Sequence, residues 1–224
     1  MQLRALVVSC LAGLGAAAAA WAAPALSQAV QGELDRAVIA YESGQLEPAR
    51  AAFESLARCQ VPAAEFNLAV MHLRGEVPRP DLPLARRLLQ HAAEGGFVTA
   101  QSRLGRTLES GELGARDLVL AHDWYERAAT GGEVDAQVAM GTAYYLGRGR
   151  PKDPARAAQW FREAAKGGDV GAMYLLASMY EQGDGLERDL RLARYWYAAA
   201  ARSGDEAAPG KVRELDAKLA ERPS

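Results

Sequence analysis

Cysteine and aromatic residues are scarce in this chain of 224 residues, and its net charge is small. Only two cysteines are present, Cys10 and Cys59, so a framework of several disulfides is excluded. No run of Lys and Arg appears, and 26 basic against 28 acidic residues give a formal charge of −2. Because nucleic-acid binding needs a clustered basic surface, we expect no nucleic-acid partner.

The longest uncharged stretch lies at the N-terminus. Met1–Arg4 carries one positive charge, Ala5–Ala20 is uncharged and Ala-rich, and small residues precede Ala23. This order is typical of a secretory signal peptide over residues 1–22. A membrane anchor is the alternative, although a spanning helix needs about 20 apolar residues. A lipoprotein cleavage site before Cys10 is a further alternative, with almost no apolar region ahead of it.

Removal of that segment leaves Cys59 as the one thiol of the mature chain. We interpret it as a small residue tolerated in a turn between repeats, with a reactive thiol or a disulfide to another chain as the alternative. The mature protein is expected to be periplasmic or secreted. We expect it to be monomeric and without stable membrane insertion.

A period of 36 residues is the strongest feature of the sequence. Positions recurring at this spacing are Ala64, Ala100, Ala136, Ala172 and Ala208; Gly75, Gly111, Gly147 and Gly183; Asp81, Asp117, Asp153 and Asp189; and Leu88, Trp124, Trp160 and Trp196. Such self-similarity indicates a tandem repeat array. We divide it into four repeats, at 64–99, 100–135, 136–171 and 172–207.

Each repeat is predicted to form two helices. In the third, Met140 and Tyr144 lie on one apolar stripe of a helix starting at about Ala136, and Gly147 suits a left-handed C-cap. Asp153 then begins the second helix as N-cap, with Pro at its first position. We expect the tryptophan of each second helix to fill the core. Small residues are expected where the two helices approach closely: Gly105, Gly141 and Ala177.

Two further segments flank the repeats. Residues 33–60 show a similar pattern with a shorter turn at Gly44, which predicts a shorter helical hairpin. Residues 208–224 place Val212, Leu215 and Leu219 on one face with charged residues around them. Stacked repeats need such a polar-backed terminal helix for solubility.

The repeat resembles the Sel1-like family, a relative of the tetratricopeptide repeat. The shared pattern is A-x3-L/M-G/A-x2-L/Y-x2-G, a short loop with Asp, and A-x2-W-x3-A-A-x2-G over Ala64–Gly204. The first repeat departs from it at His72 and Leu88. The resemblance implies an all-α, right-handed α/α solenoid of helical hairpins, with residues 33–60 as a tetratricopeptide-like first repeat and 208–224 as a C-terminal capping helix. It also implies a concave groove that binds a protein or peptide.

Sequence motifs for catalysis are lacking. There is no G-x-S-x-G, H-E-x-x-H or S-x-x-K motif, and the periodic aspartates fit N-caps better than paired carboxylates. The three histidines, His72, His91 and His122, occupy different repeat positions, so we expect no shared metal site. His72 is expected to be a hydrogen-bonded core residue. We predict no catalytic residue, metal or cofactor.

The candidate binding residues vary between repeats on the first helix, which by analogy with tetratricopeptide proteins lines the groove. They are Phe66, Arg106, Tyr145 and Tyr174, residue types that anchor interfaces; packing between repeats is the alternative interpretation of the rings. The predicted function is an exported adaptor in bacterial envelope assembly, polysaccharide export or periplasmic signalling. A secreted effector is one alternative. A hydrolase acting on a β-lactam or cell-wall substrate is another, because Cys-rich relatives of the family have been linked to β-lactamase activity.

Overall fold

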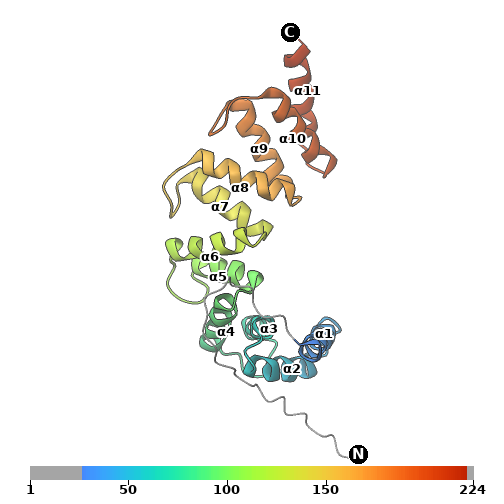
Figure 1. Cartoon of the computed structure of the whole chain (residues 1–224), viewed down its shortest axis with the longest axis vertical. Helices are drawn as coiled ribbons and strands as arrows, with labels where there is room; N and C mark the ends of the chain where they lie inside the picture. The colour runs from blue at the N-terminus through green and yellow to red at the C-terminus, as the bar shows by residue number, and fades with distance from the viewer. Residues whose placement is uncertain (1–26, 221–224) are drawn as a thin grey trace, which may run out of the picture. The chain divides into compact units, whose positions relative to one another are not determined.

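The computed structural model describes residues 27–220, which form eleven helices and no strand (Figure 1). This confirms the all-α class. The predicted signal peptide at 1–22 lies outside the described residues. The helices divide into two compact units, the first ending at Gly96 and the second beginning at Phe97.

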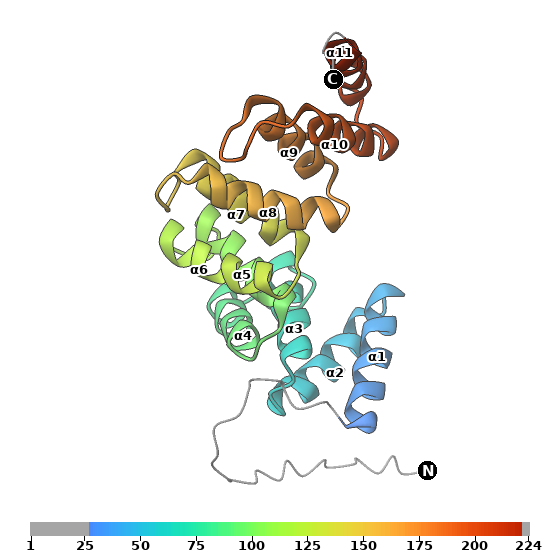
Figure 2. The same ribbon diagram turned by 45° about the horizontal axis from the view of Figure 1, so that its top comes forward.

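The first unit contains α1 (Gln28–Glu42), α2 (Leu46–Arg58), α3 (Pro62–Arg74) and α4 (Leu82–Glu94). Each helix packs against the next in chain order (Figure 2). Phe53 and Met71 are fully buried in the core that the first three helices share. The Tyr41 hydroxyl of α1 donates to the Glu76 carboxylate at 2.7 Å, which ties α1 to the loop after α3. Cys59 is half-buried at the C-cap of α2, in the turn before α3.

The second unit contains α5 (Val98–Ser110), α6 (Leu118–Thr130), α7 (Val134–Leu146), α8 (Pro154–Lys166), α9 (Val170–Gln182), α10 (Leu190–Arg202) and α11 (Ala208–Ala220). Three hairpins, α5–α6, α7–α8 and α9–α10, follow one another and α11 ends the row (Figure 1). Each second helix packs against the first helix of the next hairpin. The handedness of this succession stays a prediction.

The predicted helix ends are confirmed. Four periodic aspartates accept a hydrogen bond from the backbone N–H three residues on, at 2.8, 2.9, 3.0 and 3.0 Å: Asp81, Asp117, Asp153 and Asp189. Four periodic glycines form left-handed C-caps: Gly75, Gly111, Gly147 and Gly183. The first helix of the third repeat starts at Val134, two residues before the predicted Ala136, because the Glu133 side chain caps it by accepting from the Ala136 N–H.

The prediction that each tryptophan fills the core of its repeat is wrong for Trp160 and Trp196, which are half-buried. The next residue fills that space instead, and in the third repeat it is Phe161, only 1% exposed. A Cβ added at Gly141 would lie 2.6 Å from Phe161 Cε1, so the small residue of the first helix faces this ring directly. The indole is thereby left at the edge of the core.

The predicted capping helix is present as α11. Its Leu215 is fully buried, while Val212 and Leu219 pack against the same core. The Glu181 carboxylate of α9 accepts hydrogen bonds from Lys211 at 3.3 Å and Lys218 at 3.4 Å. An apolar face and a shared carboxylate therefore both hold α11 on the preceding repeat.

Candidate functional site

The four binding residues predicted from the sequence divide between the two units. Phe66 lies on α3 in the first unit and is half-buried. Arg106 on α5, Tyr145 on α7 and Tyr174 on α9 belong to the second unit. No hydrogen bond, ion pair or ring contact joins these last three side chains to one another in the part of the chain that the structure describes. Each of the three side chains has its own set of neighbouring residues.

Arg106 is the most exposed of the four, with 54% of its side chain accessible. Its guanidinium forms an ion pair with Asp135 at 3.2 Å. Asp135 belongs to the first turn of α7, so the bridge spans two consecutive first helices. The surfaces of α5 and α7 are thus contiguous at this point, and the bridge lies in solvent on that surface.

Tyr145 and Tyr174 are half-buried rings that pack against the core of the second unit. Tyr145 makes an edge contact with Phe161, with ring centroids 6.5 Å apart, and Tyr174 makes one with Tyr197 at 4.9 Å. Burial, together with the neighbouring Asp184, raises the pKa of the Tyr145 hydroxyl. Both tyrosines therefore contribute to packing, and each keeps an exposed part. Whether that part binds a partner stays a prediction.

A hydrogen-bonded tyrosine–glutamate pair recurs at the same position in the second and fourth repeats, and it was not predicted from the sequence. The Tyr125 hydroxyl donates to Glu109 at 3.0 Å, and the Tyr197 hydroxyl donates to Glu181 at 3.1 Å. Burial first, and then the paired glutamate, raise the pKa of each phenol. The matched 16-residue spacing in the second and fourth repeats was the signal that could have revealed it.

Gly149, two residues after the C-cap glycine Gly147, has a packing role. Gly149 has φ of 65°, and a Cβ there would lie 2.7 Å from His122 Nδ1 on α6. His122 is 3% exposed, and burial lowers its pKa below the usual histidine value. Beside it, Arg150 bonds Asp123 at 2.6 Å and reaches Glu126 at 3.4 Å. The α7–α8 loop is thus attached to the second helix of the preceding repeat.

His72 in the first unit is a buried, hydrogen-bonded residue, as predicted. Its Nδ1 accepts from the Asp81 backbone N–H at 3.1 Å, which links the end of α3 to the start of α4. His91 and Glu65 form a second contact between these helices, at 2.7 Å. Within residues 27–220 no cluster of three or more His, Cys, Asp or Glu side chains is arranged to hold a metal ion. No helix in that range is both long and apolar enough to span a bilayer.

Four segments of the chain match the Sel1 repeat: 62–97, 98–133, 134–169 and 170–205. Their 36-residue length equals the period found above, and together they span more than half of the chain. Each matched segment begins two residues before the corresponding repeat predicted from the sequence. The first helix of each repeat begins at that same earlier residue in the structure. No curated protein matches the chain.

Several solved structures are similar to this chain, and two of them share more than a quarter of its residues over most of its length. A protective antigen of uropathogenic Escherichia coli with an SLR fold shares 28% identity at a TM-score of 0.78, over 85% of this chain and 42% of that one. A Sel1 repeat protein from Oxalobacter formigenes shares 33% identity at a TM-score of 0.70, over 75% of this chain and 49% of that one. The chain therefore spans less than half the length of each.

Proposed function

This chain belongs to the Sel1 repeat family, whose members are generally non-catalytic protein-interaction scaffolds, and we propose that it is an exported scaffold that binds a protein or peptide partner. Its place would be the bacterial envelope, in envelope assembly, polysaccharide export or periplasmic signalling. The binding surface would be formed by the first helices of consecutive repeats in the second unit, at Arg106, Tyr145 and Tyr174. Phe66 would provide a separate contact on the first unit.

The contiguity of the first helices in the second unit supports this surface most directly. The Arg106–Asp135 ion pair joins α5 to α7 on the exposed side. Tyr145, at the end of α7, lies beside Asp184, which follows α9. Arg106 of α5 thus adjoins α7, and Tyr145 of α7 adjoins the loop after α9, so a partner that extends along this side would meet one contact region after another.

Exposed charge and half-exposed rings give this surface two kinds of contact. Tyr and Arg are the residue types enriched among interface hot spots, where truncation costs about 2 kcal/mol or more of binding free energy. An exposed ion pair contributes about 0–1 kcal/mol to folding, so loss of the Arg106–Asp135 bridge should have little effect on stability. Truncating Tyr145 or Tyr174 would also lower the stability of the fold, because these rings pack against Phe161 and Tyr197.

The test is affinity capture from the envelope fraction of the source cells, with tagged mature protein as bait. We expect the wild type to retain a specific protein. Arg106→Glu should reduce its recovery at least tenfold, because the charge reversal removes a central contact and repels an acidic neighbour. Tyr145→Ala and Tyr174→Ala should also lose it, with a measurable fall in melting temperature from the lost ring packing.

The matched control is Arg191→Glu, an exposed arginine on the second helix α10. It makes the same change of charge away from the first helices and should leave capture unchanged. Equal losses in both arginine variants would show a general charge effect and contradict the assigned surface. A wild-type bait that retains no protein under crosslinking conditions would contradict the scaffold function itself.

A further inference from the structure

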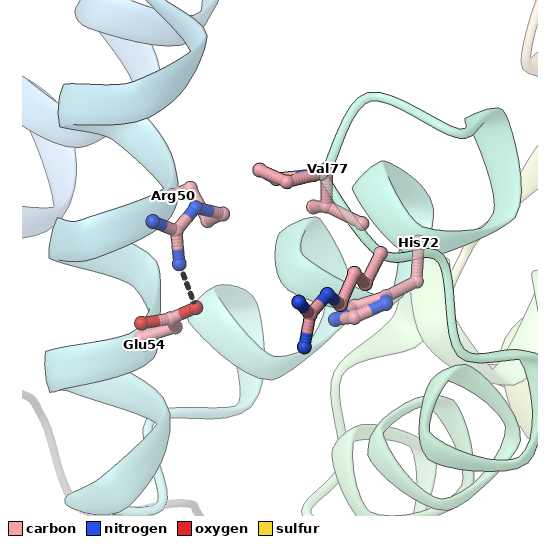
Figure 3. Close-up of a pocket in the computed structure, with 6 residues that line it drawn as sticks. Arg50, Glu54, His72 and Val77 are labelled. Carbon is pink, nitrogen blue, oxygen red and sulfur yellow. Dashed lines mark hydrogen bonds and ion pairs between the residues drawn. The ribbon is translucent and has the colours of Figure 1, made fainter.

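A cavity of about 250 Å³ opens in the first unit, between α2 and the loop that follows α3. Figure 3 shows Arg50 and Glu54 of α2 on one wall, with His72 and Val77 on the opposite wall. Pro78 and Arg79 complete the lining. Val77 is buried in the core of the unit, so one wall of the cavity is apolar and the rest is polar.

One corresponding place in the second unit, between α6 and the α7–α8 loop, is covered by a side chain of the protein itself. With the 36-residue period, Glu54 corresponds to Glu126 of α6, and Pro78 corresponds to Arg150 of the α7–α8 loop. Arg150 extends over α6 and bonds Asp123 and Glu126 there. Proline cannot make this contact, and Glu54 instead bonds Arg50 on its own helix. The first unit therefore keeps open a space that a loop side chain fills in the second.

Two hydrogen-bond donors that line the cavity have no partner within residues 27–220. His72 Nδ1 accepts from the Asp81 N–H, so in this tautomer the proton lies on Nε2, at the opposite edge of the ring. His72 lines the cavity, and no hydrogen bond from its Nε2–H to another residue in this range is present. Arg79 is exposed and forms no ion pair or hydrogen bond among these residues.

The charges on the lining favour an anion. Arg50 is engaged by Glu47 and Glu54 on its own helix, which leaves the Arg79 charge uncompensated. A carboxylate is the acceptor whose planar geometry matches a guanidinium, with bonds about twice as strong as those between neutral groups. The Nε2–H of His72 supplies a further donor, and Val77 with Pro78 offers an apolar wall for a short aliphatic stem.

The size of the cavity indicates whether the carboxylate belongs to a free small molecule or to a side chain of a larger partner. Sites for free small molecules usually occupy about 300–1,000 Å³, so this space suits one side chain of a larger partner. We propose that the cavity binds a glutamate or aspartate side chain of a peptide or protein partner, held by Arg79 and His72. The proposal rests on the scaffold function and adds to it a second contact region, with a stated preference for acidic residues.

The test is an NMR titration of the ¹⁵N-labelled full chain with capped pentapeptides, acetyl-Ala-Ala-X-Ala-Ala-amide. With X as Glu, we expect saturable shifts of the Val77 and Arg79 amides and of the His72 Nε2–H signal. With X as Gln or Lys, binding should be at least tenfold weaker, because the charge-assisted bonds are lost. Arg79→Gln should weaken the Glu peptide by the same factor.

The matched control is Arg87→Gln, which removes an exposed arginine of α4 that does not line the cavity. It should leave the affinity for the Glu peptide unchanged. Equal binding of the Glu and Gln peptides, preferred binding of the Lys peptide, or no effect of Arg79→Gln would overturn the proposal. So would sodium acetate saturating the same signals as tightly as the Glu peptide, which would indicate a site for small anions. Partner capture that persists in Arg79→Gln would leave the scaffold function standing while this site fails.

Discussion

At the scale of single residues, the cores of the second and third repeats each contain one aromatic ring that faces one glycine. Phe161 lies against Gly141 and Tyr125 against Gly105, where an added Cβ would lie 2.6 Å and 2.8 Å from the respective ring. Burying an aromatic side chain against a helix backbone brings the two helices of the hairpin close together. Trp160 and Trp196, although more prominent in the sequence, are only half-buried at the edge of the core.

Substitutions in the third repeat should separate these two roles. Phe161→Ala is expected to lower the free energy of unfolding by about 3–5 kcal/mol, because it empties a fully buried site. Trp160→Ala should cost about 1 kcal/mol, as is usual for a residue outside the packed core. Urea denaturation followed by circular dichroism measures both values, and a larger loss for Trp160→Ala would show that the indole carries the core.

Gly141→Leu tests the glycine side of the contact between Gly141 and Phe161. Since even a Cβ would lie 2.6 Å from the Phe161 ring, we expect a loss of about 1–3 kcal/mol or more from displaced packing. Gly210→Leu is the control, because a Cβ at this exposed glycine of α11 would have no atom within 4 Å, and its effect should stay within about 0.5 kcal/mol. Similar losses in both variants would contradict a close approach specific to Gly141.

At the scale of helices and loops, the second unit is held together by loops that dock on the preceding repeat. His122 of α6 is buried beneath Gly149 and faces three charged groups, Glu109, Arg150 and Asp123. Burial has the largest effect and lowers its pKa, while Glu109 opposes this and Arg150 adds to it. The α7–α8 loop therefore covers a histidine that is easier to protonate when the protein is unfolded.

The unfolding free energy should accordingly fall as the pH drops below about 6.5, the usual pKa of histidine. In that range the unfolded chain binds a proton that the folded protein does not, so protonation favours unfolding. The interval from pH 7.5 to 5.5 spans this pKa. We expect the stability of His122→Phe, measured in urea, to fall by less than that of the wild type over this interval. Parallel losses in the two proteins would assign the pH dependence to other groups.

At the scale of the whole molecule, the function proposed here requires export. The charged start, the Ala-rich stretch and the small residues before Ala23 predict cleavage at that point. N-terminal sequencing of protein from the periplasmic or extracellular fraction should begin at Ala23. Because signal cleavage requires a small residue ahead of the cut, Ala22→Phe should block it and Ala22→Ser should not. Membrane-bound protein that retains Met1 in the wild type would contradict export by this route.

Local and periodic features were all predictable from the order of residues. The aspartate N-caps and glycine C-caps depend on interactions within a few positions along the chain. The 36-residue period shows the same pattern in four successive repeats, and the apolar stripe of the capping helix can be seen in its own sequence. The all-α fold and the buried, hydrogen-bonded state of His72 follow from these features. Such signals are strong because a helix end is decided by its nearest neighbours.

Contacts between elements were decided by tertiary packing. Periodicity places Trp160 and Phe161 one position apart on the same helix, and the angular offset of about 100° between them decides which ring meets Gly141 and which remains at the edge. Likewise, no local rule pairs Glu109 with Tyr125, or reveals that Pro78 leaves open a space that Arg150 fills in the second unit. These features depend on how far one helix lies from the next, which is set jointly by all the side chains between them.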